Sequence, residues 1–159
     1  MKKKKIDQSI RSDGAENFVR AFLMIEYGII TYGASRNMPG YDLIACDHKH
    51  KNICKISVKY RSAADADGFH FSKQNDYQFA VAIVGNKGSV GNYQIGTTIE
   101  NTNLPESFKA QVFVFPKNFV LQNLNKRRVL SNPLKPKTPK KFLRYENNWY
   151  RIIKYISKK

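Results

Sequence analysis

The sequence predicts an α/β (α+β) fold, in which helices flank one central mixed β-sheet. The chain has 159 residues, which suits a single domain with one modest core. A helical pattern stands near each end, and several short apolar runs typical of strands lie between them. We therefore expect one domain over residues 1–159, with a basic arm at 1–12 and a basic, proline-containing segment at 126–144.

The clearest predicted helix covers residues 12–28. Ser12 or Asp13 is a natural N-cap, and Gly28 is a natural stop. Glu16 stands where the acid of a capping box would stand. A structural role in capping is therefore available to Glu16, besides any role in a site.

The strands are predicted from apolar runs that are bounded by turn residues. They cover residues 28–34, 41–47, 52–60, 77–85, 93–99 and 111–116. The polar turn HKHK joins 41–47 to 52–60, which predicts a hairpin, and 77–85 is strongly apolar, like a central strand. Residues 144–156 then predict a closing amphipathic helix that packs Trp149 against the sheet.

The charge of the chain points to a polyanionic partner. There are 28 Lys and Arg against 12 Asp and Glu, a net charge of +16. Nucleic acid is the expected partner, an anionic membrane surface is the rival, and a merely solubilising surface is the plain alternative. The residues expected to bind phosphates are Lys3, Lys4, Lys126, Arg127, Arg128, Lys137, Lys140 and Lys141.

The segment 126–144 concentrates this charge. It holds eight basic residues, no acid and three prolines. We expect it to be extended and to lie along a phosphate backbone, although a solvated linker would show the same composition.

Several other classes of protein are disfavoured. No apolar run follows the N-terminal lysines, so no signal peptide is expected, and no stretch approaches the length of a membrane-spanning helix. Two cysteines do not suggest a disulfide scaffold, and we expect a cytoplasmic protein. A zinc site is disfavoured because the spacing of Cys46, His48, His50 and Cys54 matches no usual structural pattern.

The hairpin predicts a pair of charged residues at its outer end. Side chains alternate along a strand, so that Lys55, Ser57 and Lys59 share one face. If the strands pair through the short turn, Asp42 lies beside Lys59. This could be a simple ion pair, but a carboxylate is also the ligand that Mg²⁺ prefers, and a lysine can hold a phosphate oxygen.

These residues carry a resemblance to a known family. The helix segment GAE, the strand YDLIAC and the strand end ISVK together resemble the core of the PD-(D/E)xK nuclease superfamily, over roughly residues 12–62. The resemblance implies a restriction-endonuclease-like sheet and a Mg²⁺ (or Mn²⁺) cofactor. It also implies that Asp42 is the first metal ligand, Lys59 the motif lysine and Glu16 the helix acid that completes the site.

One position departs from the family pattern. Ser57 stands where members usually carry Glu, Asp or Gln, and a hydroxyl is a poor substitute for a carboxylate as a Mg²⁺ ligand. An acid from elsewhere could compensate, and the downstream candidates are Asp65, Asp67 and Asp76. Otherwise the site binds metal weakly, or the protein has kept nucleic-acid binding and lost catalysis.

The leading hypothesis is therefore a metal-dependent endonuclease that hydrolyses the phosphodiester bonds of DNA, duplex or branched. The alternative is a nuclease-like protein that binds nucleic acid without cutting it. A basic protein of the membrane surface is the third, weaker hypothesis. A homodimer would be convenient for cutting both strands of a duplex.

Overall fold

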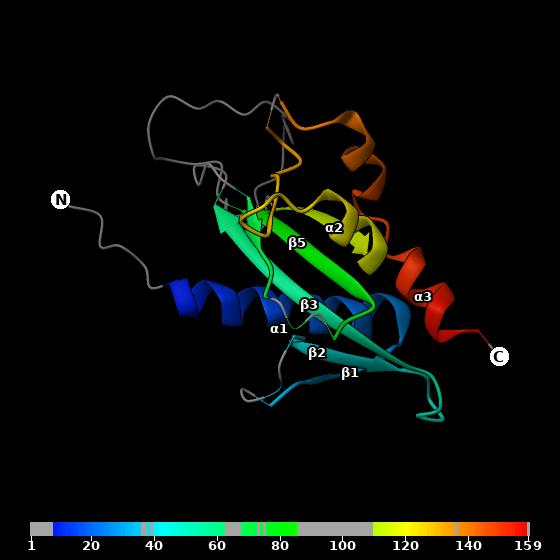
Figure 1. The fold of residues 1–159 in the computed structure, drawn as a ribbon. Helices are drawn as coiled ribbons and strands as arrows, with labels where there is room; N and C mark the ends of the chain where they lie inside the picture. Colours follow the sequence, from blue (N-terminus) through cyan, green and yellow to red (C-terminus); the bar gives the residue numbers. More distant parts are fainter. Residues whose placement is uncertain are drawn as a thin grey trace, which may run out of the picture.

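The computed structural model describes residues 8–35, 38, 40–62, 68–72, 74, 76–85, 110–135 and 137–158. Its elements are α1 (Gln8–Tyr27), β1 (Ile30–Gly33), β2 (Leu43–Cys46), β3 (Ile53–Ser62), β4 (Phe69–His70), β5 (Phe79–Gly85), β6 (Gln111–Pro116), α2 (Lys117–Asn123), β7 (Val129–Leu130), the 3₁₀-helix η2 (Lys140–Tyr145) and α3 (Tyr150–Ile156). The predicted fold class is confirmed, because one mixed sheet is flanked by helices (Figure 1).

The central sheet has five strands in the order β1-β2-β3-β5-β6. The neighbours β3 and β5 are parallel, and the other three pairs are antiparallel. All seven residues of β5 are buried, as the strongly apolar run 77–85 predicts for a central strand. A second sheet of two strands, β4 and β7, was not predicted, because each strand is only two residues long.

Strand alternation divides the interior into two cores, one on each face of the sheet. The first core lies under α1 and α3 and contains Val19, Ile56, Val58 and Ile152. The second core is rich in aromatic residues and lies under α2, η2 and the β4–β7 pair. Because Ile56 and Val58 point into the first core, Ser57 and Lys59 point to the second face.

The helix α1 corrects one detail of the sequence prediction. It already includes Gln8, so that Ser12 and Asp13 lie inside it and cannot be its N-caps. The capping-box role for Glu16 is therefore wrong as well. The predicted stop is confirmed: Gly28 has φ +62°, and its N–H donates to the carbonyl of Met24, which closes the helix.

The C-terminal third also differs from the prediction. The segment 126–144 is not extended, because it contains β7, a series of turns and most of η2. Asn132 holds these turns: its side chain accepts from the N–H of Leu134 at 3.0 Å, and its carbonyl accepts from the hydroxyl of Thr138 at 2.6 Å. The closing helix α3 is confirmed but begins only at Tyr150. The helix α2 was missed by the sequence analysis.

Some predictions lie outside the described residues. These are the strand at 93–99, most of the basic arm with Lys3 and Lys4, and the acids Asp65 and Asp67. Within the described part of the chain, no helix is long and apolar enough to cross a membrane.

Candidate active site

The candidate site is built at the point where β2 begins beside β3. The pairing of Leu43 with Ile56 places Asp42 next to Ser57. The backbone of Asp42 is fixed on both sides, because its N–H donates to the carbonyl of Ile56 at 2.9 Å and its carbonyl accepts from the N–H of Ala34 at 2.8 Å. A carboxylate is thus held on a rigid part of the sheet.

One oxygen of the Asp42 carboxylate receives the polar interactions that the described residues make with this side chain. Its Oδ2 accepts from the backbone N–H of Val58 at 2.6 Å and from the hydroxyl of Ser57 at 3.1 Å. The ammonium group of Lys59 lies 3.6 Å from the same oxygen. Among the described residues, no hydrogen bond or ion pair to Oδ1 is seen, so this second oxygen keeps its capacity to bind a ligand.

The pairing of Asp42 and Lys59 is too exposed to be explained by stability. Their side chains are 26% and 32% exposed, and an ion pair of this kind contributes under about 1 kcal/mol. The ammonium group has three donors, and at 3.6 Å it is at most loosely engaged by Asp42. The predicted juxtaposition is therefore present, with the lysine still able to bind a further anion.

The acid Asp76, one of the candidates to compensate for Ser57, has a different neighbour. Its Oδ2 lies 2.6 Å from the ammonium group of Lys55, which also stands 4.8 Å from the ring centre of Tyr41. The hydrogen bond to Asp76 raises the pKa of Lys55. Asp76 is thus committed to a second ion pair on the same strand face.

Glu16 comes from the helix that covers the other face of the sheet. It is half-buried and follows Ala15, whose side chain belongs to the first core. The helix α1 packs against β1 and β3 (Figure 1). Among the described residues, no group of three or more His, Cys, Asp or Glu side chains could hold a metal ion. Any ion at this site would therefore depend on one or two carboxylates.

A close backbone contact fixes the approach to Asp42. Gly40 has φ +90°, and a Cβ atom added there would lie 2.5 Å from the carbonyl oxygen of Gln74 and 2.8 Å from the backbone N of Asp76. Only glycine fits such a position. The sequence shows this glycine, but nothing in the sequence indicates the chain segment that packs against it.

Basic residues continue from Lys59 across the second face. Arg61 follows on the same side of β3, and its Nε donates to the carbonyl of Gly68 at 3.1 Å, just before β4. The strand β4 pairs with β7, and the turn before β7 carries the exposed Lys126 and Arg127. Lys137, Lys140 and Lys141 are also exposed, near the part of η2 whose Phe142 packs in the second core.

Arg128 differs from its neighbours. Its Nε donates to the carbonyl of Phe71 at 3.2 Å, and its Nη2 donates to the carbonyl of Ser72 at 2.6 Å. Its guanidinium group therefore holds the β4 segment to the β7 segment. Arg61 was missed by the sequence analysis, although its alternation with Lys59 could have indicated it.

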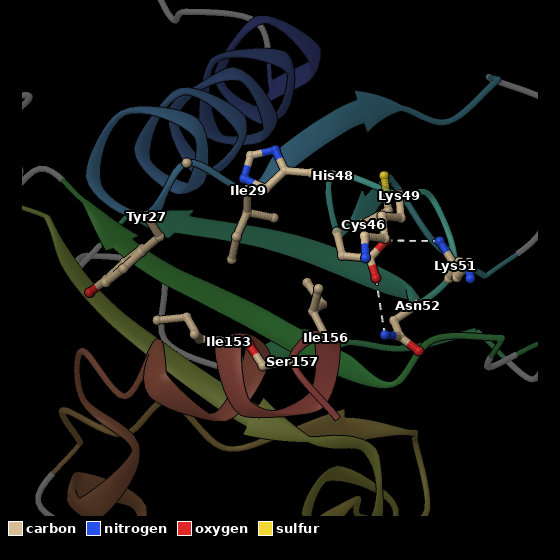
Figure 2. Close-up of a pocket in the computed structure, with 12 residues that line it drawn as sticks. Tyr27, Ile29, Cys46, His48, Lys49, Lys51, Asn52, Ile153, Ile156 and Ser157 are labelled. Carbon is tan, nitrogen blue, oxygen red and sulfur yellow. Dashed lines mark hydrogen bonds between the residues drawn. The ribbon is translucent and has the colours of Figure 1, made fainter. Parts of the chain in front are cut away.

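The other end of the hairpin forms an open pocket of about 630 Å³ between α1, α3 and the hairpin turn. In Figure 2, Ile29, Ile153 and Ile156 line this pocket, and Lys49 and Lys51 line it from the hairpin turn on the right. Asp47 accepts from the N–H of Lys51 at 2.8 Å, which lowers its pKa. Asp42 precedes β2 and Asp47 follows it, so this pocket is separate from the candidate active site.

The two cysteines of the hairpin do not point toward a common site. The register pairs Cys46 with Ile53 and Cys54 with Ala45, so the two thiols lie on opposite faces. Burial raises the pKa of Cys54 to about 12, so this thiol is protonated at neutral pH. Cys46 instead lies 3.4 Å from Nδ1 of His50 within the turn.

The described elements form an α/β fold in which helices flank a mixed five-stranded sheet. A solved structure with a similar fold is that of a bacterial homing endonuclease, I-Ssp6803I, with a TM-score of 0.57. The alignment covers 93% of this chain and 92% of that chain at 17% identity, which shows similarity of fold alone. No family model and no curated protein sequence matches the chain.

Proposed function

We propose that the protein is an endonuclease of the PD-(D/E)xK type that hydrolyses DNA phosphodiester bonds. The observation that carries this proposal is the geometry of Asp42, whose Oδ2 is held by Ser57, Val58 and Lys59 while Oδ1 stays open. The similarity of the fold to a homing endonuclease supports the same class of activity. The net charge of +16 supports a nucleic acid as the substrate.

The residues present fit a Mg²⁺ (or Mn²⁺) ion only if most of its ligands come from elsewhere. Mg²⁺ in phosphoryl-transfer sites often has one or two carboxylate ligands and completes its shell with water and substrate phosphate. Asp42 would hold the ion through Oδ1. The second acid that the resemblance implies is Glu16, which would have to reach the ion from α1. When bound, such an ion lowers the pKa of a water molecule and stabilises charge on the phosphoryl oxygens.

The chain itself positions the reacting groups. The rigid backbone of Asp42 and the contacts of its Oδ2 fix the direction of Oδ1. Lys59 is a compact positive charge next to that carboxylate, suited to hold a phosphate oxygen or to orient the attacking water. Exposed lysines and arginines on the same face would hold the DNA backbone through contacts that do not depend on sequence.

A second candidate function is favoured by Ser57. This residue supplies a hydroxyl in place of the usual second acid, and that hydroxyl already donates to Asp42. A protein that has lost the acid could bind DNA on the same surface without cutting it. Such a protein would show binding that weakens with salt and would show no turnover with any metal.

The test is cleavage of linear, supercoiled and four-way-junction DNA with Mg²⁺, with Mn²⁺ or with EDTA. We expect cleavage that requires the metal and that is lost in Asp42→Asn, a change that keeps the shape of the side chain. DNA binding by Asp42→Asn should remain at least as strong as in the parent protein, because a negative charge is removed. Binding without cleavage under every condition would contradict the nuclease proposal and favour the second function.

A further inference from the structure

The outer surface of α1 carries an apolar stripe that faces away from the sheet. Ala15, Val19 and Leu23 are buried on the inner side of the helix. The stripe on the opposite side consists of Ile10, Gly14, Phe18, Ala21 and Ile25, at spacings of four, four, three and four residues. Ile10 is 64% exposed and Ile25 is 79% exposed. Exposed apolar residues that line one helix face in this way usually mark an interaction site.

Gly14 provides a second, independent observation. Glycine destabilises the interior of a helix, and it is normally kept there for backbone conformation or for close approach. A Cβ atom added to Gly14 would meet no described atom within 4 Å, and Gly14 is not among the glycines with positive φ. Nothing in the described part of this chain therefore requires glycine at that position. A helix that packs closely against the stripe would require it.

The stripe is complementary to itself. In an antiparallel pair of α1 helices centred between residues 17 and 18, Ile10 of one copy lies opposite Ile25 of the other. The same register places Gly14 opposite Ala21, so that the two small residues meet and the backbones approach closely. This arrangement has two-fold symmetry, as isologous interfaces between identical subunits do.

The charge of α1 favours the same partner. The helix has three acids, Asp13, Glu16 and Glu26, and two arginines, Arg11 and Arg20. It is thus nearly neutral in a chain of net charge +16. Electrostatic repulsion between two copies of such a chain is therefore weakest when their α1 helices face each other. DNA, in contrast, is attracted to the basic segments on the other face of the sheet.

We propose that α1 forms a homodimer interface by antiparallel pairing with α1 of a second copy. A helix of 20 residues is about 30 Å long, and a single helix pair buries less than the roughly 800 Å² per partner of a standard interface. The dimer should therefore dissociate in the micromolar range. The stripe faces away from the sheet, so that a dimer formed through it would leave the side of the sheet with Asp42 and Lys59 open to DNA.

The test is sedimentation of the full chain without DNA, in high salt, over a wide micromolar range of concentration. We expect a monomer–dimer equilibrium for the parent protein. In Ile25→Glu the dissociation constant of the dimer should rise about 100-fold. A symmetric dimer loses one buried apolar side chain from each of its two copies. Gly14→Leu should also give monomers, because the added side chain separates the helices.

The matched control is Leu143→Glu on η2, a residue that is 45% exposed and lies outside the stripe. It should dimerise like the parent protein, and circular dichroism should show that all the variants are folded. If the parent protein stays monomeric at the highest concentration, the proposal is overturned. Dimerisation that persists in Ile25→Glu overturns it as well. Neither outcome depends on DNA cleavage.

Discussion

At the scale of single residues, the site depends on how Asp42 is held. A carboxylate with one oxygen bound by two hydrogen bonds and the other open has its orientation fixed before any ligand arrives. Ser57 contributes to this as a donor. We therefore interpret Ser57 as a positioning residue for Asp42, and not as a weak replacement for a metal ligand.

Ser57→Ala tests this interpretation. Loss of a hydrogen bond to a charged group should lower the rate of DNA cleavage by about 10-fold to 100-fold. Asp42 is 26% exposed, so water can partly replace the lost donor, and the melting temperature should fall by only a few degrees. We expect the metal concentration for half-maximal activity to rise, because Asp42 is less well oriented. Unchanged metal dependence in Ser57→Ala would contradict a positioning role.

The sequence predicted part of this site. Strand alternation and a short turn were enough to bring Asp42 beside Lys59, because both are local consequences of a hairpin. The donor role of Ser57 could not be predicted, since it depends on which way Asp42 turns where β2 begins. The pairing of Asp76 with Lys55 depends on the parallel contact of β3 with β5, which the sequence does not specify.

At the scale of elements, the segment before β2 sets the position of Asp42. Gly40 takes a backbone conformation that other residues rarely adopt, and it touches the loop around Gln74. Gly40→Ala should destabilise the protein by about 2 kcal/mol or more and should reduce cleavage, because the chain before Asp42 must move. Chemical denaturation measures the first effect.

Gly33→Ala is the matched control. A Cβ atom at Gly33 meets nothing within 4 Å, so the free energy of unfolding of Gly33→Ala should differ from that of the parent protein by less than about 0.5 kcal/mol. Equal stability of the two variants would show that the contact with Gln74 does not constrain the site.

The limits of sequence reasoning are clearest in the segment 126–144. Its prolines and charges favoured an extended chain, yet buried Leu130, Asn132 and Phe142 fold it against the second core. Tertiary contacts decided its conformation. The start of α1 was missed for a different reason: Ser12 and Asp13 are good caps, but their positions were also compatible with a longer helix.

At the scale of the whole molecule, basic residues differ in their surroundings in a way that composition cannot show. Arg127 is exposed in a turn, while its neighbour Arg128 holds two backbone carbonyls. Arg127→Ala should weaken DNA binding and reduce the slope of its salt dependence by about 1, with no loss of stability. Arg128→Ala should destabilise the fold by about 1–2 kcal/mol, because two hydrogen bonds are lost.

Fluorescence anisotropy with labelled DNA and thermal unfolding distinguish the two effects. If Arg127→Ala left the salt dependence unchanged, the turn before β7 would not belong to the DNA-binding surface.

We propose that Lys59 and Asp42 form a site for phosphodiester hydrolysis. The most direct measurement compares single-turnover DNA cleavage by Lys59→Met and Lys55→Met. The two lysines lie on one face of β3, each near an aspartate, and both side chains are 32% exposed. We predict that the single-turnover rate of cleavage falls by about 100-fold or more in Lys59→Met. In Lys55→Met the rate should stay within a few-fold of the rate of the parent protein. Equal effects of the two substitutions, or full activity of Lys59→Met, would contradict the account.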